Sequence, residues 1–416
     1  MKITDIKALE ILDSRGNPTV RTFLQTEDNS WHVGSVPSGA STGSNEVLEL
    51  RDNDEKRYGG KGVQKAVENV NTKIKDLVKD QETDPKEIDK KMLELDGTGD
   101  KSNLGANAIL SVSMAVTHAA AHSSHLPLWQ YVRQYFFPNL NNLEANKFPQ
   151  LMVNIVNGGK HAGWNFDLQE FMVVPVSATP SESIRVASEV FHSLGKLLKE
   201  KNLSTLVGDE GGYSPALGSN EEVLDTITEA AKRAGYERGK DYRLSLDCAA
   251  SEFFEDGKYI FKKANKTLNG EELRNYYKEL GQKYGILSFE DPFDEDDWDS
   301  WKAFQETSGS EFTLIGDDLF TTNPERIKHG IEMKAANGVL IKLNQIGTVS
   351  ETAEAIRLGK DAGWKIAVSH RSGETEDNFI ADLAYASNAD FIKSGSMSRS
   401  ERLSKYNRLL EIEKGI

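Results

Sequence analysis

The second half of the chain alternates short β-rich runs with helical patterns, and this rhythm limits its fold more than any other feature. Six runs between residues 242 and 393 are rich in β-branched and aromatic residues, and each ends at a polar or charged residue. From Glu290 onward the run ends lie 23 to 28 residues apart, which suits one strand, one helix and their loops. Such alternation predicts parallel strands with crossover helices, and hence an α/β domain built as a β/α barrel.

The residues at the run ends are candidates for one active site, because strand C-termini converge on one face of a β/α barrel. An alternative is that they only cap the helices that follow, as Asp and Ser often do. Capping does not explain lysine, histidine or arginine at these positions. The set is Asp247, Glu290, Asp317, Lys342, Ser369-His370-Arg371 and Lys393.

The first part of the chain has a different pattern. Residues 1–36 read as a strand meander, and helical spacing follows from Val63 to Leu77 and over Ala106–Ala121. With 416 residues the chain exceeds the size of a usual single core, so two domains are expected. We expect a smaller α+β domain at 1–125, a connector at 126–149 and the barrel at 150–416.

The residues at which these β-rich runs end indicate a site that binds a metal ion and an anion. Three carboxylates brought together repel one another, and a hard cation with open coordination positions, such as Mg²⁺, resolves that repulsion. Arg371 and Ser372 offer a guanidinium fork and a hydroxyl that suit a phosphate. The small-residue loop 38–43 suits a mobile lid, although a plain turn is the alternative. The acidic run at 294–299 is interpreted as a solvated surface.

Composition limits partners and location. The net charge of −15 opposes nucleic acid and anionic lipid, so we expect no direct nucleic-acid partner. The single cysteine, Cys248, allows no intrachain disulfide and favours a reducing compartment. No apolar run approaches the length of a membrane span, and the first residues lack a signal-peptide core. These features predict a cytoplasmic protein.

Many motifs, in order along nearly the whole chain, resemble the enolase family, and the pattern is that of the bacterial type. The matching stretches are Asp13–Thr19, Pro37–Gly43, Gly158–Gly163, Gln169–Met172, Val207–Gly212, Asp247–Phe253, Glu290–Pro292, Gly316–Leu319, Lys342–Gly347, Ser369–Asp377 and Ser398–Arg402. The resemblance implies a phosphopyruvate hydratase, a Mg²⁺-dependent lyase that interconverts 2-phosphoglycerate and phosphoenolpyruvate. It also implies a modified (β/α)8 barrel with one reversed strand, and a homo-oligomer, dimer or octamer.

The resemblance also implies a role for each matching residue. Lys342 is the base for the C2 proton, and Glu210 is the acid for the C3 hydroxyl, with Glu170 beside it. Two Mg²⁺ ions are implied, the second bound with the help of Ser41 on the loop. The first Mg²⁺ is held by Asp247, Glu290 and Asp317. His161 and His370 line the pocket. The substrate is bound by Gln169, Arg371, Ser372, Lys393 and Ser41. Because a base must be neutral, we expect the nearby Mg²⁺ ions and Lys393 to lower the pKa of Lys342.

Three positions depart from the family pattern, and two other functions compete. The departures are Asn45, Val47 and Trp164, none of which is a catalytic group. An acid-sugar dehydratase or racemase of the same superfamily would share the three carboxylates but lack Ser41 and Glu210 in its Gly-Asp-Glu-Gly-Gly setting. A surface receptor or scaffold paralogue, displayed at the cell surface and binding other proteins, would be signalled by a lost catalytic group, and none is lost.

Overall fold

The N-terminal domain in this computed structural model is a three-stranded meander covered by helices. The structure describes residues 1–39, 43–140, 147–159, 163 and 165–416. Antiparallel strands β1 (Ile3–Leu12), β2 (Pro18–Thr26) and β3 (Trp31–Ser35) form the sheet in that order. The helical part comprises α1 (Gln64–Asn69), a π-helical turn (Val70–Ile74), α2 (Lys75–Val78), α3 (Pro85–Asp96) and α4 (Ala106–Ser123).

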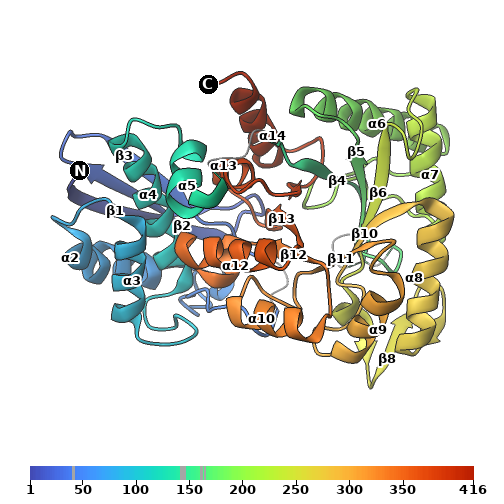
Figure 1. Cartoon of the computed structure of the whole chain (residues 1–416), viewed down its shortest axis with the longest axis horizontal. Coiled ribbons are helices and arrows are strands. Elements are labelled where there is room, and N and C mark those ends of the chain that lie inside the picture. The colour runs from blue at the N-terminus through green and yellow to red at the C-terminus, as the bar shows by residue number, and fades with distance from the viewer. Residues whose placement is uncertain (40–42, 141–146, 160–162, 164) are drawn as a thin grey trace.

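Helix α4 lies between the two domains, and nearly all of its residues are buried. It packs on β2 and β3 on one side and on barrel helices α11 (Leu343–Ile346) and α12 (Val349–Asp361) on the other. Its small residues permit this close approach. A Cβ at Gly34 in β3 would lie 2.3 Å from the carbonyl oxygen of Ser111, so only glycine fits there. Figure 1 shows the resulting arrangement, with the two domains side by side.

The second domain is a closed eight-stranded barrel, which confirms the predicted fold class. Its strands are β4 (Gln150–Asn157), β5 (Glu170–Pro175), β6 (Tyr242–Asp247), β10 (Ile286–Glu290), β11 (Thr313–Gly316), β12 (Gly338–Ile341), β13 (Lys365–Ser369) and β14 (Phe391–Lys393). Strand β5 runs antiparallel to both neighbours, while the other neighbouring pairs are parallel. This is the reversed strand that the family resemblance implied. Its first residue therefore lies at the face where the other strands end.

Helices surround the barrel, and apolar side chains fill it. The outer helices are α6 (Pro180–Glu200), α7 (Asn220–Arg233), α8 (Gly270–Tyr284), α9 (Trp298–Ser308), α10 (Pro324–Met333), α13 (Phe379–Ala386) and α14 (Ser400–Glu413), with a small sheet of β7 (Phe254–Glu255), β8 (Lys258–Phe261) and β9 (Lys266–Leu268). The interior includes Met152, Met172, Ile315, Leu340 and Phe391, all buried. The predicted site residues Asp247, Glu290 and Lys393 lie beyond this interior, as the last residues of their strands.

The stretch expected as a connector begins with a helix, α5 (Leu128–Phe136). Val132 and Phe136 are fully buried, and the helix packs on α13. Arg133 also donates hydrogen bonds to the carbonyls of Tyr385 and Ala386, at 2.5 and 3.0 Å. The prolines and asparagines that suggested a linker lie on either side of this amphipathic segment. Residues 141–146 of the expected connector lie outside the described part of the chain.

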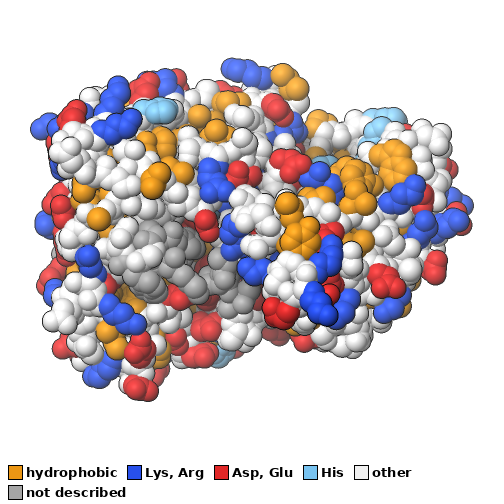
Figure 2. Space-filling model, turned by 180° about the vertical axis from the view of Figure 1, so that it is seen from behind, with side chains coloured by type: hydrophobic (Ala, Val, Ile, Leu, Met, Phe, Trp, Pro, Cys, Tyr) orange, Lys and Arg blue, Asp and Glu red, His pale blue; other side chains and the backbone are white. Residues whose placement is uncertain are grey.

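No helix in the described ranges is both long and apolar enough to cross a membrane. On the face of the molecule shown in Figure 2, acidic and basic side chains are interspersed rather than gathered by sign.

A buried aspartate joins the two domains and should make stability depend on pH. Both the backbone N–H and the hydroxyl of Ser350, in the first turn of α12, donate to Asp89 of α3, at 3.1 and 2.6 Å. Burial raises the pKa of Asp89 from its ordinary 3.8 to about 6. The protonated carboxyl therefore favours the folded state, and that contribution is lost as pH rises from about 4 to 6.

We expect Asp89→Asn, which mimics the protonated form, to gain stability relative to wild type over that pH range. The full effect, a shift of about two pKa units, corresponds to at most about 3 kcal/mol. The difference in Tm between variant and wild type, followed by circular dichroism from pH 4.5 to 7.5, should increase and then level off above pH 6. A difference that does not vary with pH would contradict this origin.

Candidate active site

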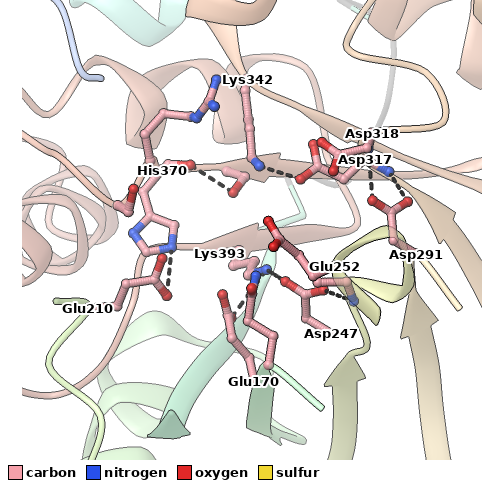
Figure 3. Close-up of a pocket in the computed structure, with 15 residues that line it drawn as sticks. Glu170, Glu210, Asp247, Glu252, Asp291, Asp317, Asp318, Lys342, His370 and Lys393 are labelled. Carbon is pink, nitrogen blue, oxygen red and sulfur yellow. Dashed lines mark hydrogen bonds and ion pairs between the residues drawn. The ribbon is translucent and has the colours of Figure 1, made fainter. Parts of the chain in front are cut away.

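The strand ends converge on one pocket, as the alternation predicted. Its lining includes Gln169, Glu170, Glu210, Asp247, Glu252, Asp291, Asp317, Asp318, Lys342, His370, Arg371, Ser372 and Lys393. Asp247 and Glu290 are the last residues of the neighbouring strands β6 and β10 and lie in register. Glu170 pairs in register with Asp247 because β5 is reversed. Figure 3 shows His370 and Glu210 on one side, Asp291, Asp317 and Asp318 on the other, and Lys393 between them.

Lys393 is the centre of the carboxylate group. Its ammonium lies 3.2 Å from Glu170, 3.0 Å from Asp247 and 2.8 Å from Glu290, and all four side chains are buried. Burial opposes the charged lysine, but the carboxylates outweigh it and raise the pKa of Lys393 well above its usual value. Lys393 therefore holds a positive charge among the predicted metal ligands.

Lys342 follows β12 and contacts the third predicted ligand, Asp317. Gln345 binds the other oxygen of Asp317 through its amide nitrogen at 2.8 Å. Burial would lower the pKa of Lys342, but the carboxylates, Asp317 foremost, outweigh it and raise that pKa. Lys393 alone therefore does not lower this pKa as expected, because the direct contact with Asp317 was not evident from sequence. The lowering expected from bound Mg²⁺ stays a prediction.

His370 is held in one tautomer. The guanidinium of Arg402 lies 2.5 Å from Nδ1 and can only donate, so Nδ1 accepts and the proton sits on Nε2. Burial lowers the pKa of His370 well below its usual value, so the ring is neutral. Nε2 faces an oxygen of Glu210 at 3.6 Å, and Asn154 donates to the same oxygen at 3.0 Å. A positioned acid and a neutral donor thus share one wall of the pocket.

The pocket holds more negative charge than its own cations balance, which fits a metal ion. Burial and neighbouring carboxylates raise the pKa of Glu170, Glu290 and Asp291 well above their usual values, and that of Asp318 to about 8. A divalent cation would relieve this repulsion, and carboxylate oxygens are the ligands that Mg²⁺ prefers.

Among the residues that the structure describes, one group of carboxylates is close enough together to hold such an ion. Asp291, Asp317 and Asp318 have oxygens within 4.8 Å of one another. Asp291, however, accepts the backbone N–H groups of Asp317 and Asp318, both at 2.8 Å, and so orients that segment. Asp247 and Glu290, two of the predicted ligands, instead share the ammonium of Lys393. Asp317, the third predicted ligand, belongs to the close group.

The predicted substrate residues Gln169, Arg371 and Ser372 also line the pocket. Arg371 is buried, and its Nη1 and Nη2 donate hydrogen bonds to the two carboxylate oxygens of Glu46 at 2.9 and 3.1 Å. The sequence assigned no role to Glu46, Glu252, Asp291 or Asp318. Asp291 and Asp318 directly follow strand-end ligands, which is the signal that could have identified them. Ser41, His161 and Trp164 lie outside the described residues.

A barrel with carboxylates, a lysine and an opposed glutamate at the strand ends defines a class of enzymes that remove a proton beside a carboxylate with metal assistance. The sequence matches the family model for the enolase C-terminal TIM barrel domain over residues 145–416, and that for the enolase N-terminal domain over residues 3–132. The chain belongs to the enolase family. It is a phosphopyruvate hydratase, a glycolytic lyase that interconverts 2-phosphoglycerate and phosphoenolpyruvate, and the family implies Mg²⁺.

Proposed function

We propose that Lys342 and Glu210 are the two proton-transfer groups of this reaction. The observation that carries the proposal is that they enter one buried pocket from different sides, with His370 beside Glu210 (Figure 3). Lys342 removes the C2 proton of 2-phosphoglycerate. Glu210, with Glu170 nearby, then protonates the departing C3 hydroxyl so that it leaves as water. His370 lines the pocket and its neutral ring supports Glu210. The pocket role of His161, which lies outside the described residues, is proposed from the family resemblance alone.

The remaining residues bind the substrate and metal in this proposal. Arg371, Ser372, Gln169, Lys393 and Ser41 hold the substrate. Asp247, Glu290 and Asp317 hold one Mg²⁺, and Ser41 contributes to a second. Bound Mg²⁺ would stabilise the negative charge that develops on the substrate carboxylate when the C2 proton leaves.

The direct test is ultraviolet detection of phosphoenolpyruvate formed from 2-phosphoglycerate with and without Mg²⁺. We expect activity that requires the metal. Asp317→Asn removes one anionic ligand, so its activity should need higher Mg²⁺ concentrations while its circular dichroism spectrum stays unchanged. A Mg²⁺ titration curve identical to wild type would remove Asp317 from the metal site.

We also propose that the chain forms homo-oligomers through an apolar surface around Arg399. Leu12 and Leu206 are 53% and 78% exposed, unusually open for leucine. Arg399 donates to the carbonyls of Ser14 and Gly208, at 2.7 and 3.4 Å, and so brings the two leucine-bearing segments together. Burial of this surface against a second copy would remove it from water.

Leu206→Asp should therefore shift the protein to a smaller species in size-exclusion chromatography with light scattering. Leu95→Asp, at a leucine in α3 that is also exposed, serves as the control and should keep the wild-type mass. Equal masses for all three proteins would place the interface elsewhere.

Three further features remain proposals from sequence. We propose a cytoplasmic location on the basis of the single cysteine, which cell fractionation can test. Display at the cell surface and binding of other proteins are proposed second roles, testable by surface labelling. That the protein is an enolase of the bacterial type is proposed from its motif pattern alone.

A further inference from the structure

Glu46 and Arg371 form a buried, two-point ion pair at the edge of the active site. Arg371 Nη1 donates to Oε2 of Glu46 at 2.9 Å and Nη2 donates to Oε1 at 3.1 Å, so both ends of the fork are engaged. The two side chains are only 4% and 6% exposed. Nη1 also donates to Asn344 at 3.0 Å. These contacts fix both the position and the plane of the guanidinium.

Glu46 also connects Arg371 to two neighbouring parts of the site. Its Oε1 accepts the backbone N–H of Gly43 at 3.2 Å and lies 3.4 Å from the amide nitrogen of Gln345. That same nitrogen donates to Asp317 at 2.8 Å. Gln345 is fully buried, and its amide oxygen accepts from Thr322 at 2.7 Å, so its orientation is fixed. One carboxylate thus joins the loop after residue 42, the arginine and the segment next to Asp317.

We propose that Glu46 is a positioning residue for phosphate recognition. It holds Nη1 and Nη2 of Arg371, so that the guanidinium meets the substrate phosphate in one fixed orientation. The inference rests on the phosphate role proposed above for Arg371. Because all N–H donors of a guanidinium lie in one plane and point in defined directions, fixing that plane reduces the ordering that phosphate binding must impose.

The chemistry of the pair makes a carboxylate necessary at position 46. Two parallel N–H donors require two acceptor oxygens on one group, which glutamate supplies. A glutamine offers one oxygen and turns its NH₂ toward an arginine N–H, so two donors oppose each other. Aspartate keeps the charge but is one methylene shorter.

The matched control is Glu49, a second carboxylate in the same loop that pairs with a different arginine. Arg51 lies 2.6 Å from Glu49. Glu49→Gln therefore makes the same chemical change nearby without removing an Arg371 contact. If loop disruption alone mattered, both variants would weaken ligand binding alike.

The experiment measures binding by isothermal titration calorimetry in the presence of Mg²⁺, with 2-phosphoglycolate and its phosphate-free counterpart glycolate. We expect Glu46→Gln to lower the affinity for 2-phosphoglycolate at least about tenfold, and the affinity for glycolate less than about twofold. Glu46→Asp should recover part of the loss, and Glu49→Gln should leave the affinity ratio of the two ligands near the wild-type value. Circular dichroism checks that each variant is folded.

A double-mutant cycle then tests whether the effect passes through Arg371. Because Glu46 acts only by placing that side chain, Arg371→Lys combined with Glu46→Gln should bind 2-phosphoglycolate about as weakly as Arg371→Lys alone, within about twofold. Losses that simply multiply, or equal losses for both ligands in Glu46→Gln, would overturn the positioning role. An unchanged ligand ratio in Arg371→Lys alone would instead overturn the phosphate role of Arg371.

Discussion

Replacing Lys342 with alanine is expected to abolish both the formation of phosphoenolpyruvate and the exchange of the C2 hydrogen of 2-phosphoglycerate with solvent. Lys342 is buried beside Asp317, at the pocket wall across from Glu210. Loss of a general base lowers the rate by roughly 10²–10⁴-fold or more. Incubation with substrate in D₂O, followed by proton NMR, measures exchange and product in one sample.

Glu210→Gln is the paired variant and should separate the two steps. The amide cannot protonate the leaving hydroxyl, so little phosphoenolpyruvate should form. If the carbanion forms before the hydroxyl departs, Lys342 still removes the C2 proton and exchange continues. The neighbouring Asn154 contact can be kept by the amide oxygen, so the pocket wall should remain in place.

Opposite outcomes assign the roles differently. C2 exchange at the wild-type rate in Lys342→Ala would show that another group is the base. No exchange in Glu210→Gln, with substrate still bound and the spectrum of the folded protein unchanged, would place Glu210 in the first step or indicate that the two bonds break together.

The strand ends were predictable because each is a local signal. A β-rich run that stops at Asp247, Glu290 or Lys342 needs no knowledge of the rest of the fold. The barrel then brings these ends together as a geometric consequence of parallel strands. The resemblance to the family motifs predicted the role of each strand-end residue. The alternation of strands and helices predicted that these residues lie at one end of the barrel.

The reversed strand β5 did not follow from the rhythm, although the chain contains a signal for it. Only residues 158–169 separate β4 from β5. A parallel connection needs a crossover of about a dozen or more residues, usually a helix. This stretch only just reaches that length, and it has glycines and no helical period. An antiparallel β5 is the alternative that fits, and it places Glu170 at the active-site face.

The ionic partners inside the pocket could not be predicted, because they depend on side-chain reach between distant segments. The Glu46–Arg371 pair joins residues 325 positions apart. Without bound Mg²⁺, the contact between Lys342 and Asp317 likewise outweighs the lowering of the lysine pKa that Lys393 was expected to cause. Spacing in the sequence predicts which strand ends lie close together, but it does not predict which acidic side chain pairs with which basic one.

Lys393→Met should destabilise the metal-free protein, because it removes the cation that Glu170, Asp247 and Glu290 share. Methionine has similar length and no charge, so the change is mainly electrostatic. Breaking a buried ion pair by removing one partner typically costs about 3–5 kcal/mol. We therefore expect a lower Tm in EDTA than for wild type, and little activity because Lys393 also lies at the substrate site.

Mg²⁺ should reverse much of this loss of stability, since a divalent cation held by Asp247 and Glu290 restores positive charge where the ammonium was. The rise in Tm between EDTA and Mg²⁺ should be larger for Lys393→Met than for wild type, measured by differential scanning calorimetry. Lys405→Met is the matched control, because Lys405 is equally buried and pairs with Glu374 at 2.8 Å outside the pocket lining. That variant should be destabilised without a larger Mg²⁺ response. If Lys393→Met gained no more from Mg²⁺ than Lys405→Met, the ammonium and the metal would not compensate the same carboxylates, and the assignment of Asp247 and Glu290 as metal ligands would fail.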